Sequence, residues 1–108
     1  MQDNPIAVAI SGPNENQLGA LCRTLVNERL AASANITPQI RSIYWWNEAV
    51  QDHAESLALL HTVRAAFPSI IARVKELHPY QLPQIVCMPI DASPEYLAWI
   101  RSSTAQRS

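Results

Sequence analysis

The apolar positions near the start of the chain change from a continuous run to a helical spacing. Residues 6–11 are almost all apolar and end at a Gly-Pro pair, which predicts a short strand followed by a turn. Asn14 then offers a helix N-cap, with Gln17 in the capping-box position. Apolar residues recur at helical spacing through Leu30, which predicts a long first helix with one buried stripe.

Two stretches rich in β-branched and aromatic residues follow, and they predict a long strand hairpin. The first covers residues 34–46 and is expected to bend near Thr37 and Pro38. The second covers residues 50–63. The segment 47–49 between them is the expected turn, although it lacks the glycine that favours a tight hairpin.

The remaining pattern predicts helix, strand and helix. Pro68 suits the first turn of a second helix, which ends at His78 because a residue before proline is pushed out of the helical region. Residues 84–90 predict a fourth strand, and a short last helix begins at Pro94. We expect the tail from about residue 102 to be frayed.

This order of elements predicts the fold class. It is β-α-β-β-α-β with an extra C-terminal helix, which is the α+β, ferredoxin-like (split β-α-β) pattern of an antiparallel sheet. We expect residues 1–108 to form a single domain. Proline cannot donate to a strand ladder, and Pro38 and Pro89 fall in the second and fourth strands, which this fold places at the sheet edges.

Both faces of the predicted sheet are apolar. Side chains alternate along a strand, so Ile43 and Trp45 point to one side while Tyr44 and Trp46 point to the other. The two main helices of this fold cover one face only. We therefore expect other copies of the chain to cover the second face, because monomers seldom expose so large an apolar patch.

Charge and composition exclude several classes of partner. Eight Lys and Arg against nine Asp and Glu give a net charge of −1, which argues against a nucleic-acid partner. No apolar run approaches about 18 residues, and the start has no basic, apolar leader, so we expect neither a membrane span nor a signal peptide. With only two well-separated cysteines, the chain is expected to be cytoplasmic.

Several stretches of this chain, in this order and spacing, resemble the CutA divalent-cation tolerance family. The stretches are ERLAASANI at 28–36, SIYWW at 42–46, ELHPY at 76–80 and YLAWI at 96–100. The likeness runs from about residue 6 to 101. It implies a ferredoxin-like fold, a PII-like homotrimer in which long hairpins pair with neighbouring subunits, a role in the response to metal ions with copper binding, and no established reaction.

The chain departs from the family pattern at several positions. Ser33 stands where the family usually has cysteine, His61 replaces a lysine, and Gln84 replaces an acid. Several thiol or charged positions of the family are therefore neutral here. A structural trimer that has lost its metal ligands stays open as an alternative.

His78 and Cys87 are the candidate ligands for copper or another divalent metal. His78 lies at a helix end, where imidazole can bind a metal or simply cap the last carbonyls of the helix. Cys87 alternates with Met88, and soft sulfur donors suit Cu(I), although a thiol in an apolar strand is also a common core residue. Cys22 and His61 are expected to be packed residues.

Trp46 and Tyr80 are the candidate lining of a ligand cleft between subunits, with ordinary packing as the alternative. An acidic stretch that includes Asp52 and Glu55 could hold a hard cation or form a solvated turn. The chain has no HExxH, GxSxG or CxxC motif and no phosphate-binding loop, so we expect a binding protein and not an enzyme. The rivals are a PII-like module for a small ligand and a small enzyme that uses His78 as general acid and base.

Overall fold

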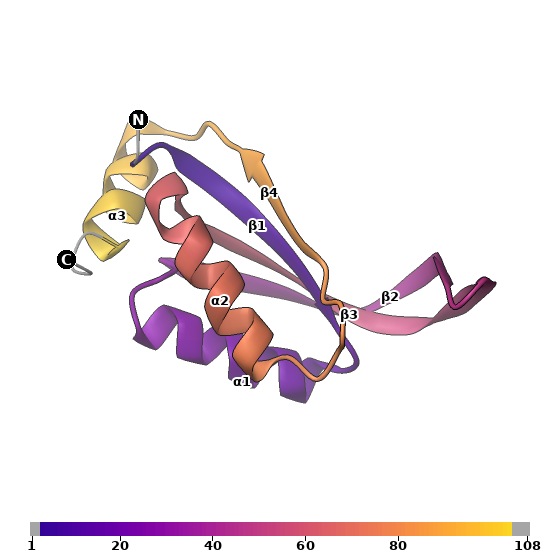
Figure 1. Ribbon diagram of the computed structural model, residues 1–108. Helices are drawn as coiled ribbons and strands as arrows, with labels where there is room; N and C mark the ends of the chain where they lie inside the picture. Colours follow the sequence, from indigo (N-terminus) through magenta and orange to yellow (C-terminus); the bar gives the residue numbers. More distant parts are fainter. Residues whose placement is uncertain (1–2, 105–108) are drawn as a thin grey trace.

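The structure is a computed structural model that describes residues 3–104. Four strands form one antiparallel sheet in the order β2-β3-β1-β4, and two helices, α1 and α2, lie together on one side of it (Figure 1). The elements are β1 (Pro5–Gly12), α1 (Glu15–Asn27), β2 (Ser33–Trp46), β3 (Ala49–Val63), a 3-10 turn (Arg64–Ala66), α2 (Phe67–Leu77), β4 (Ile85–Pro89) and α3 (Pro94–Thr104). The predicted α+β, ferredoxin-like fold is confirmed, with the prolines of β2 and β4 on the edge strands.

Helix α1 begins as predicted but ends earlier. Asn14 Oδ1 accepts the Gln17 N–H at 2.8 Å, and the Gln17 side chain accepts from the Asn14 amide at 3.3 Å. At the other end Arg29 is left-handed, with φ 61°, and the Leu30 N–H reaches back to the Leu25 carbonyl at 3.0 Å. This is a Schellman ending, so Leu30 packs on the core from outside the helix and not, as predicted, as part of its stripe.

Helix α2 ends where it was predicted to end, whereas α3 extends farther than predicted. Helix α2 stops before His78, which takes an extended conformation with ψ 138°, as a residue before proline should. Helix α3 continues through Thr104, whose hydroxyl donates to the Ile100 carbonyl at 2.9 Å and whose side chain is buried. Residues 102–104 are thus helical, whereas we expected a frayed tail from about 102; residues 105–108 lie outside the described part of the chain.

The hairpin turn is tighter than predicted. Trp46 pairs directly with Ala49, so the loop consists of Asn47 and Glu48 alone, with φ of 52° and 62°. Two positive φ angles match the twist of a two-residue hairpin. The predicted bend in β2 is confirmed as a bulge at residues 38–39, where the register between Thr37 and Ile40 shifts.

The hairpin extends beyond the rest of the sheet and forms a projecting arm. Strand β1 pairs with β3 only as far as Gly12 opposite Ser56, so residues 40–55 pair only with each other. We name these residues the arm and the remainder of the described chain the body. The arm projects from the body in Figure 1, and the molecule measures 43 × 26 × 24 Å.

The core of the body lies between the sheet and the helices α1 and α2. Its largest fully buried apolar side chains come from β1, β3 and all three helices: Ile6, Val8, Ile10, Leu18, Leu25, Leu60, Ile70, Val74 and Ile100. On the opposite face of the sheet α3 covers only one end, where Tyr96 contacts His61. Val86 and Met88 on that face stay exposed, as do large apolar side chains on both faces of the arm.

Candidate functional site

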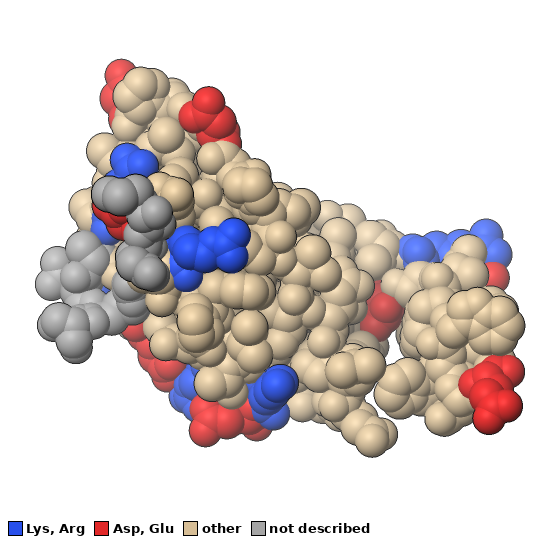
Figure 2. All heavy atoms as spheres, turned by 45° about the horizontal axis from the view of Figure 1, so that its top comes forward, with Lys and Arg blue, Asp and Glu red and all other residues tan. Residues whose placement is uncertain are grey.

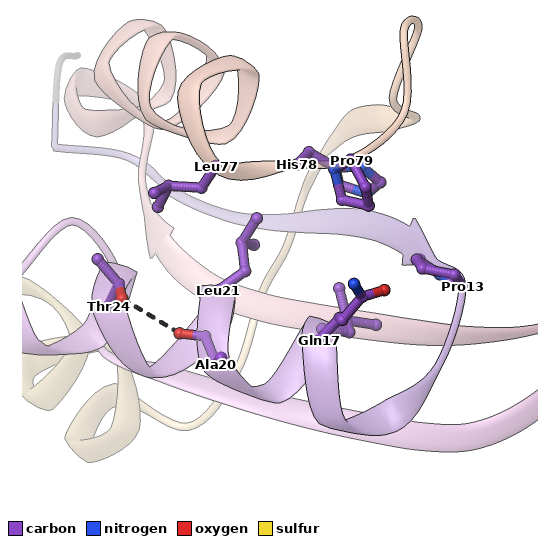
Figure 3. A pocket seen from close by; sticks show the side chains of 10 residues that line it. Pro13, Gln17, Ala20, Leu21, Thr24, Leu77, His78 and Pro79 are labelled. Carbon is purple, nitrogen blue, oxygen red and sulfur yellow. Dashed lines mark hydrogen bonds between the residues drawn. The ribbon is translucent and has the colours of Figure 1, made fainter.

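The surface has two hollows near the residues that sequence analysis selected. The smaller, about 290 Å³, lies between α1 and the end of α2; Leu21 and Leu77 point toward it (Figure 3), and His78 is part of its lining. Its polar groups are largely engaged elsewhere; the Thr24 hydroxyl, for example, donates to the Ala20 carbonyl at 3.1 Å. This hollow offers no free titratable group.

His78 lies at the edge of that hollow, but both of its ring nitrogens are occupied. It is 8% exposed, its Nε2 lies 2.6 Å from the Ser11 carbonyl oxygen, and its Nδ1 accepts the Tyr80 N–H at 3.1 Å. Since a backbone N–H can only donate, Nδ1 is unprotonated and Nε2 carries the hydrogen. His78 therefore ties the loop after α2 to the end of β1, and no lone pair is left for a metal or for acid-base work.

Cys87 is not brought to His78. It pairs with Val8 in the sheet and packs against the core, while Ser11, the partner of His78, lies three residues farther along β1, about 10 Å away. Cys22 is buried in the core as expected, and burial raises the pKa of its thiol to about 11. Within residues 3–104, no three or more His, Cys, Asp and Glu side chains gather as a metal site.

The larger hollow lies between the arm and the loop that follows α2. It has a volume of about 680 Å³ and contains both Trp46 and Tyr80 in its lining, so the structure does bring these two predicted residues together. We name it the aromatic cleft. In the space-filling view the surface is hollowed where the arm leaves the body (Figure 2). The lining is Ser11, Tyr44, Trp46, His53, Glu55, Pro79, Tyr80, Gln81, Leu82, Pro83 and Gln84.

A buried carboxylate lies at the base of the aromatic cleft. Glu55 is 6% exposed and accepts a hydrogen bond from the Tyr80 hydroxyl. Burial raises the pKa of Tyr80 well above its usual range, and the hydrogen bond and negative charge of Glu55, with a smaller contribution from Tyr44, add to the rise. Tyr80 is therefore a neutral donor at physiological pH, and Glu55 is the acceptor.

A second polar pair lies on the arm side of the cleft. Tyr44 Oη is 2.7 Å from His53 Nε2, and His53 Nδ1 is 3.0 Å from the Ala54 carbonyl oxygen. Because a carbonyl only accepts, Nδ1 carries hydrogen, and in the neutral ring Nε2 accepts from Tyr44. The two rings meet edge to face with centroids 5.5 Å apart, which holds the Tyr44 ring in place.

The acidic stretch of the arm does not form one site, because alternation sends its members to different faces. Asp52 forms a bidentate pair with Arg41, at 2.8 and 2.7 Å, on the face away from Glu55. That hydrogen-bonded pair lowers the pKa of the Asp52 carboxyl. Glu48 lies in the turn. Glu55 is expected from the sequence only as one member of this stretch; its burial was not predicted, because it depends on the distant Tyr80.

His61 is a packed residue, as expected, at the other end of the sheet. Its Nδ1 lies 2.8 Å from the Tyr96 hydroxyl, and Ser33 Oγ lies 3.4 Å from both groups. The three polar groups satisfy one another beneath α3. None of the helices formed by residues 3–104 is both long and apolar enough to span a membrane.

Comparison with known proteins matches this chain to one family across nearly its full length. The model of the CutA1 divalent ion tolerance proteins matches residues 6–103. The chain belongs to the CutA1 family. It is 45% identical to the divalent-cation tolerance protein CutA of Thermus thermophilus over 98 residues, which cover 90% of this chain and 95% of that protein.

Solved CutA1 structures share the fold. The CutA1 structure from Oryza sativa has a TM-score of 0.91 at 33% identity and covers 99% of this chain and 98% of that one. The Thermus thermophilus structure has a TM-score of 0.89 at 44% identity, with coverage of 93% and 98%. The chain spans only 58% of the full rice chloroplastic protein CutA 1, to which it is 34% identical over 94% of its own length.

Proposed function

We propose that this CutA1 protein acts in tolerance of divalent metal ions as a homotrimer that binds copper or a related ion. The observation that carries the proposal is the family match over residues 6–103. Binding, and not catalysis, is proposed because the strongest candidate for acid-base chemistry, His78, has both nitrogens hydrogen bonded to the backbone.

The exposed apolar side chains of the arm support assembly. Trp45, Ile43 and Val50 share one face of the arm and are 73%, 59% and 56% exposed. A tryptophan side chain has roughly 150–250 Å² of surface, which is costly to leave in water. The resemblance to CutA trimers supplies the stoichiometry, with each arm pairing with a neighbouring protomer.

A charged substitution at the centre of this patch tests the assembly. We expect wild-type protein to sediment with the mass of three chains and Trp45→Lys to sediment as a monomer that keeps its circular dichroism spectrum. Asn16→Lys adds the same charge to an exposed position of α1 and should leave the mass unchanged. A monomeric wild-type protein, or a trimeric Trp45→Lys variant, would contradict the proposal.

The metal proposal concerns the assembly and not the single chain. His78 and Cys87 are apart, and no metal-ligand group forms within residues 3–104. We therefore propose that copper is held by donors from more than one protomer. Calorimetric titration with Cu²⁺ should show binding to the wild-type protein and loss of binding in monomeric Trp45→Lys.

Each outcome of the copper titration has a definite meaning. Equal binding by wild type and the monomeric variant would place the metal within one chain and contradict the shared site. No binding by the wild type would remove copper from the proposal and leave a structural trimer or a small-ligand protein.

We place the protein in the cytoplasm. Both Cys22 and Cys87 are free thiols, which fits a reducing compartment. Cell fractionation of the natural host tests this placement, and recovery in an exported fraction would contradict it.

A second candidate function is the binding of a small ligand in the manner of PII proteins. The aromatic cleft favours it, because a 680 Å³ hollow lined by aromatic rings together with polar side chains is typical of small-molecule sites.

A further inference from the structure

We propose that the aromatic cleft binds a small organic cation, an alkylammonium or aromatic ammonium compound, with Glu55 as its counter-ion. This rests on the small-ligand form of the proposed function and does not depend on copper. The proposal is carried by the carboxylate, by the rings around it, and by the absence of any Lys or Arg from the lining of the cleft.

Glu55 is a buried acid without a cationic partner. No ion pair among residues 3–104 includes it, and its single hydrogen bond is the one that Tyr80 donates to Oε2. A carboxylate taken out of water is costly unless it is paired and hydrogen bonded. A bound cation would supply the missing charge.

The second oxygen of this carboxylate faces accessible space. Glu55 Oε1 has no hydrogen-bond partner. Among the described residues, every fully buried side-chain oxygen or nitrogen has such a partner. Oε1 is therefore not fully buried, and Glu55 is part of the lining of the cleft. An ammonium group in the cleft could donate directly to this oxygen, in a charge-assisted hydrogen bond.

The walls of the cleft suit a cation with apolar substituents. Tyr44, Trp46 and Tyr80 line it, and within the single chain the first two are 39% and 38% exposed, so part of each of these rings is available to a ligand. The face of an aromatic ring attracts a cation within about 6 Å, most strongly for tryptophan. Leu82, 72% exposed, adds apolar surface to the same lining.

The same lining disfavours anions and hard metal ions. Arg41, on the arm, is held by Asp52 on the face away from Glu55, so a phosphate or carboxylate would meet one buried negative charge and no Lys or Arg side chain. A hard divalent ion takes six or more oxygen ligands, whereas the cleft offers a single carboxylate. An organic cation needs fewer directed contacts, because the rings provide much of its attraction.

Titration of the trimeric protein with a matched set of probes tests the proposal. The probes are benzyltrimethylammonium, benzylamine, benzyl alcohol and benzoate. Binding of each is measured from the indole N–H resonance of Trp46 in a nitrogen-15 spectrum. We expect the two cations to bind and shift this resonance, the alcohol to bind at least tenfold more weakly, and benzoate not to bind. Equal binding of benzoate, or no binding of either cation, would overturn the proposal.

Two variants locate the site on Glu55. Glu55→Gln keeps the shape and the hydrogen bond to Tyr80 but removes the charge, and we expect at least a tenfold loss of affinity for benzyltrimethylammonium. Asp52→Asn removes a carboxylate from the opposite face of the arm and should leave the affinity unchanged. Similar losses of affinity in both variants would mean that the net negative charge of the protein, and not a site at Glu55, attracts the cation.

The remaining experiments separate this proposal from the others. If Glu55→Gln does not fold, the wild-type probe series still decides, because it needs no variant. If the cations bind only to monomeric Trp45→Lys and not to the trimer, a neighbouring protomer fills the cleft and the proposal is wrong. Cation binding in a protein that binds no copper would support the proposal while contradicting the metal function, and copper binding without cation binding would do the reverse.

Discussion

The body and the arm are built from the same two strands, yet they bury their side chains very differently. Ala58 and Leu60 of β3 are 0% exposed, because β1 lies beside them and the helices cover them. Ile43 and Trp45 of β2, in the arm, are 59% and 73% exposed. Both stretches alternate apolar side chains across the sheet, so the difference comes only from what lies alongside. Within the single chain, large apolar residues of the arm stay uncovered, whereas the core residues of the body are covered by the sheet and the helices.

Polar groups show the same contrast. In the body the Thr62 hydroxyl donates to the Leu30 carbonyl at 2.6 Å and His78 bonds to two backbone groups, so buried polar atoms are satisfied internally. Where the arm meets the body, Glu55 is buried with one carboxylate oxygen bonded to Tyr80. At this junction the chain therefore has both exposed apolar side chains and a buried carboxylate without a cationic partner.

The largest expected effect separates the core of the body from the surface of the arm. In the monomeric Trp45→Lys background, Leu60→Ala should lower the free energy of unfolding by about 2–5 kcal/mol, because it leaves a cavity in a fully buried site. Ile43→Ala removes a similar volume from the exposed arm and should cost less than about 1 kcal/mol. Urea denaturation measures both values. Equal losses would mean that Ile43 is as well packed as Leu60 within a single chain, which would contradict the difference between arm and body.

Alkaline pH should weaken the body through Cys22. Its pKa is raised from 9.0 to about 11 by burial, so the folded state keeps the thiol protonated while the unfolded state loses the proton. The contribution of the protonated Cys22 thiol to the free energy of unfolding is fully present below pH 9. It falls by about 2 kcal/mol as the pH rises to about 11. Urea midpoints measured between pH 8 and 11, at one protein concentration, should fall less steeply for Cys22→Ala than for wild type. Parallel curves would show that Cys22 does not contribute.

The smallest expected effect concerns the two left-handed sites. Glu48 in the arm and Arg29 in the body have φ of 62° and 61°, a conformation that costs a residue with a Cβ about 1–2 kcal/mol. Glu48→Gly should raise the thermal midpoint, with a gain of at most about 1 kcal/mol. Arg29→Gly should gain less, because the Arg29 guanidinium also donates to the Ser103 carbonyl at 3.1 Å. A lower midpoint for Glu48→Gly would mean that its side chain makes a stabilising contact.

Most of the fold was predictable because its signals are local. The Asn14 cap and the proline after His78 act within a few residues of themselves, and both boundaries are confirmed. The edge positions of β2 and β4 followed from the order of the elements, and the prolines in these two strands agreed with them. The end of α1 was wrong because Leu30 continues the helical spacing, although the left-handed Arg29 has already ended the helix.

The candidate site was harder to predict because its members meet across the fold. His78 was the strongest single candidate for a metal ligand. In the structure its Nε2 is hydrogen bonded to the carbonyl of Ser11, which is far away in sequence, so His78 has a structural role. Trp46 and Tyr80 were proposed together and do share a cleft. Glu55 was named only as part of the acidic stretch, because nothing near it in sequence indicates that it is buried against Tyr80.

The sequence by itself determined the elements, their order, and the central and edge strands, because caps, prolines and alternation act over short distances. The family followed from the resemblance of stretches such as residues 28–36 and 76–80. Only the tertiary structure decided which apolar stretches are covered and which polar groups are satisfied. Burial and hydrogen bonding depend on neighbours that the chain supplies from elsewhere: α1 and α2 for the body, and nothing within residues 3–104 for the outer face of the arm. For that reason the aromatic cleft and its buried carboxylate became visible only in three dimensions.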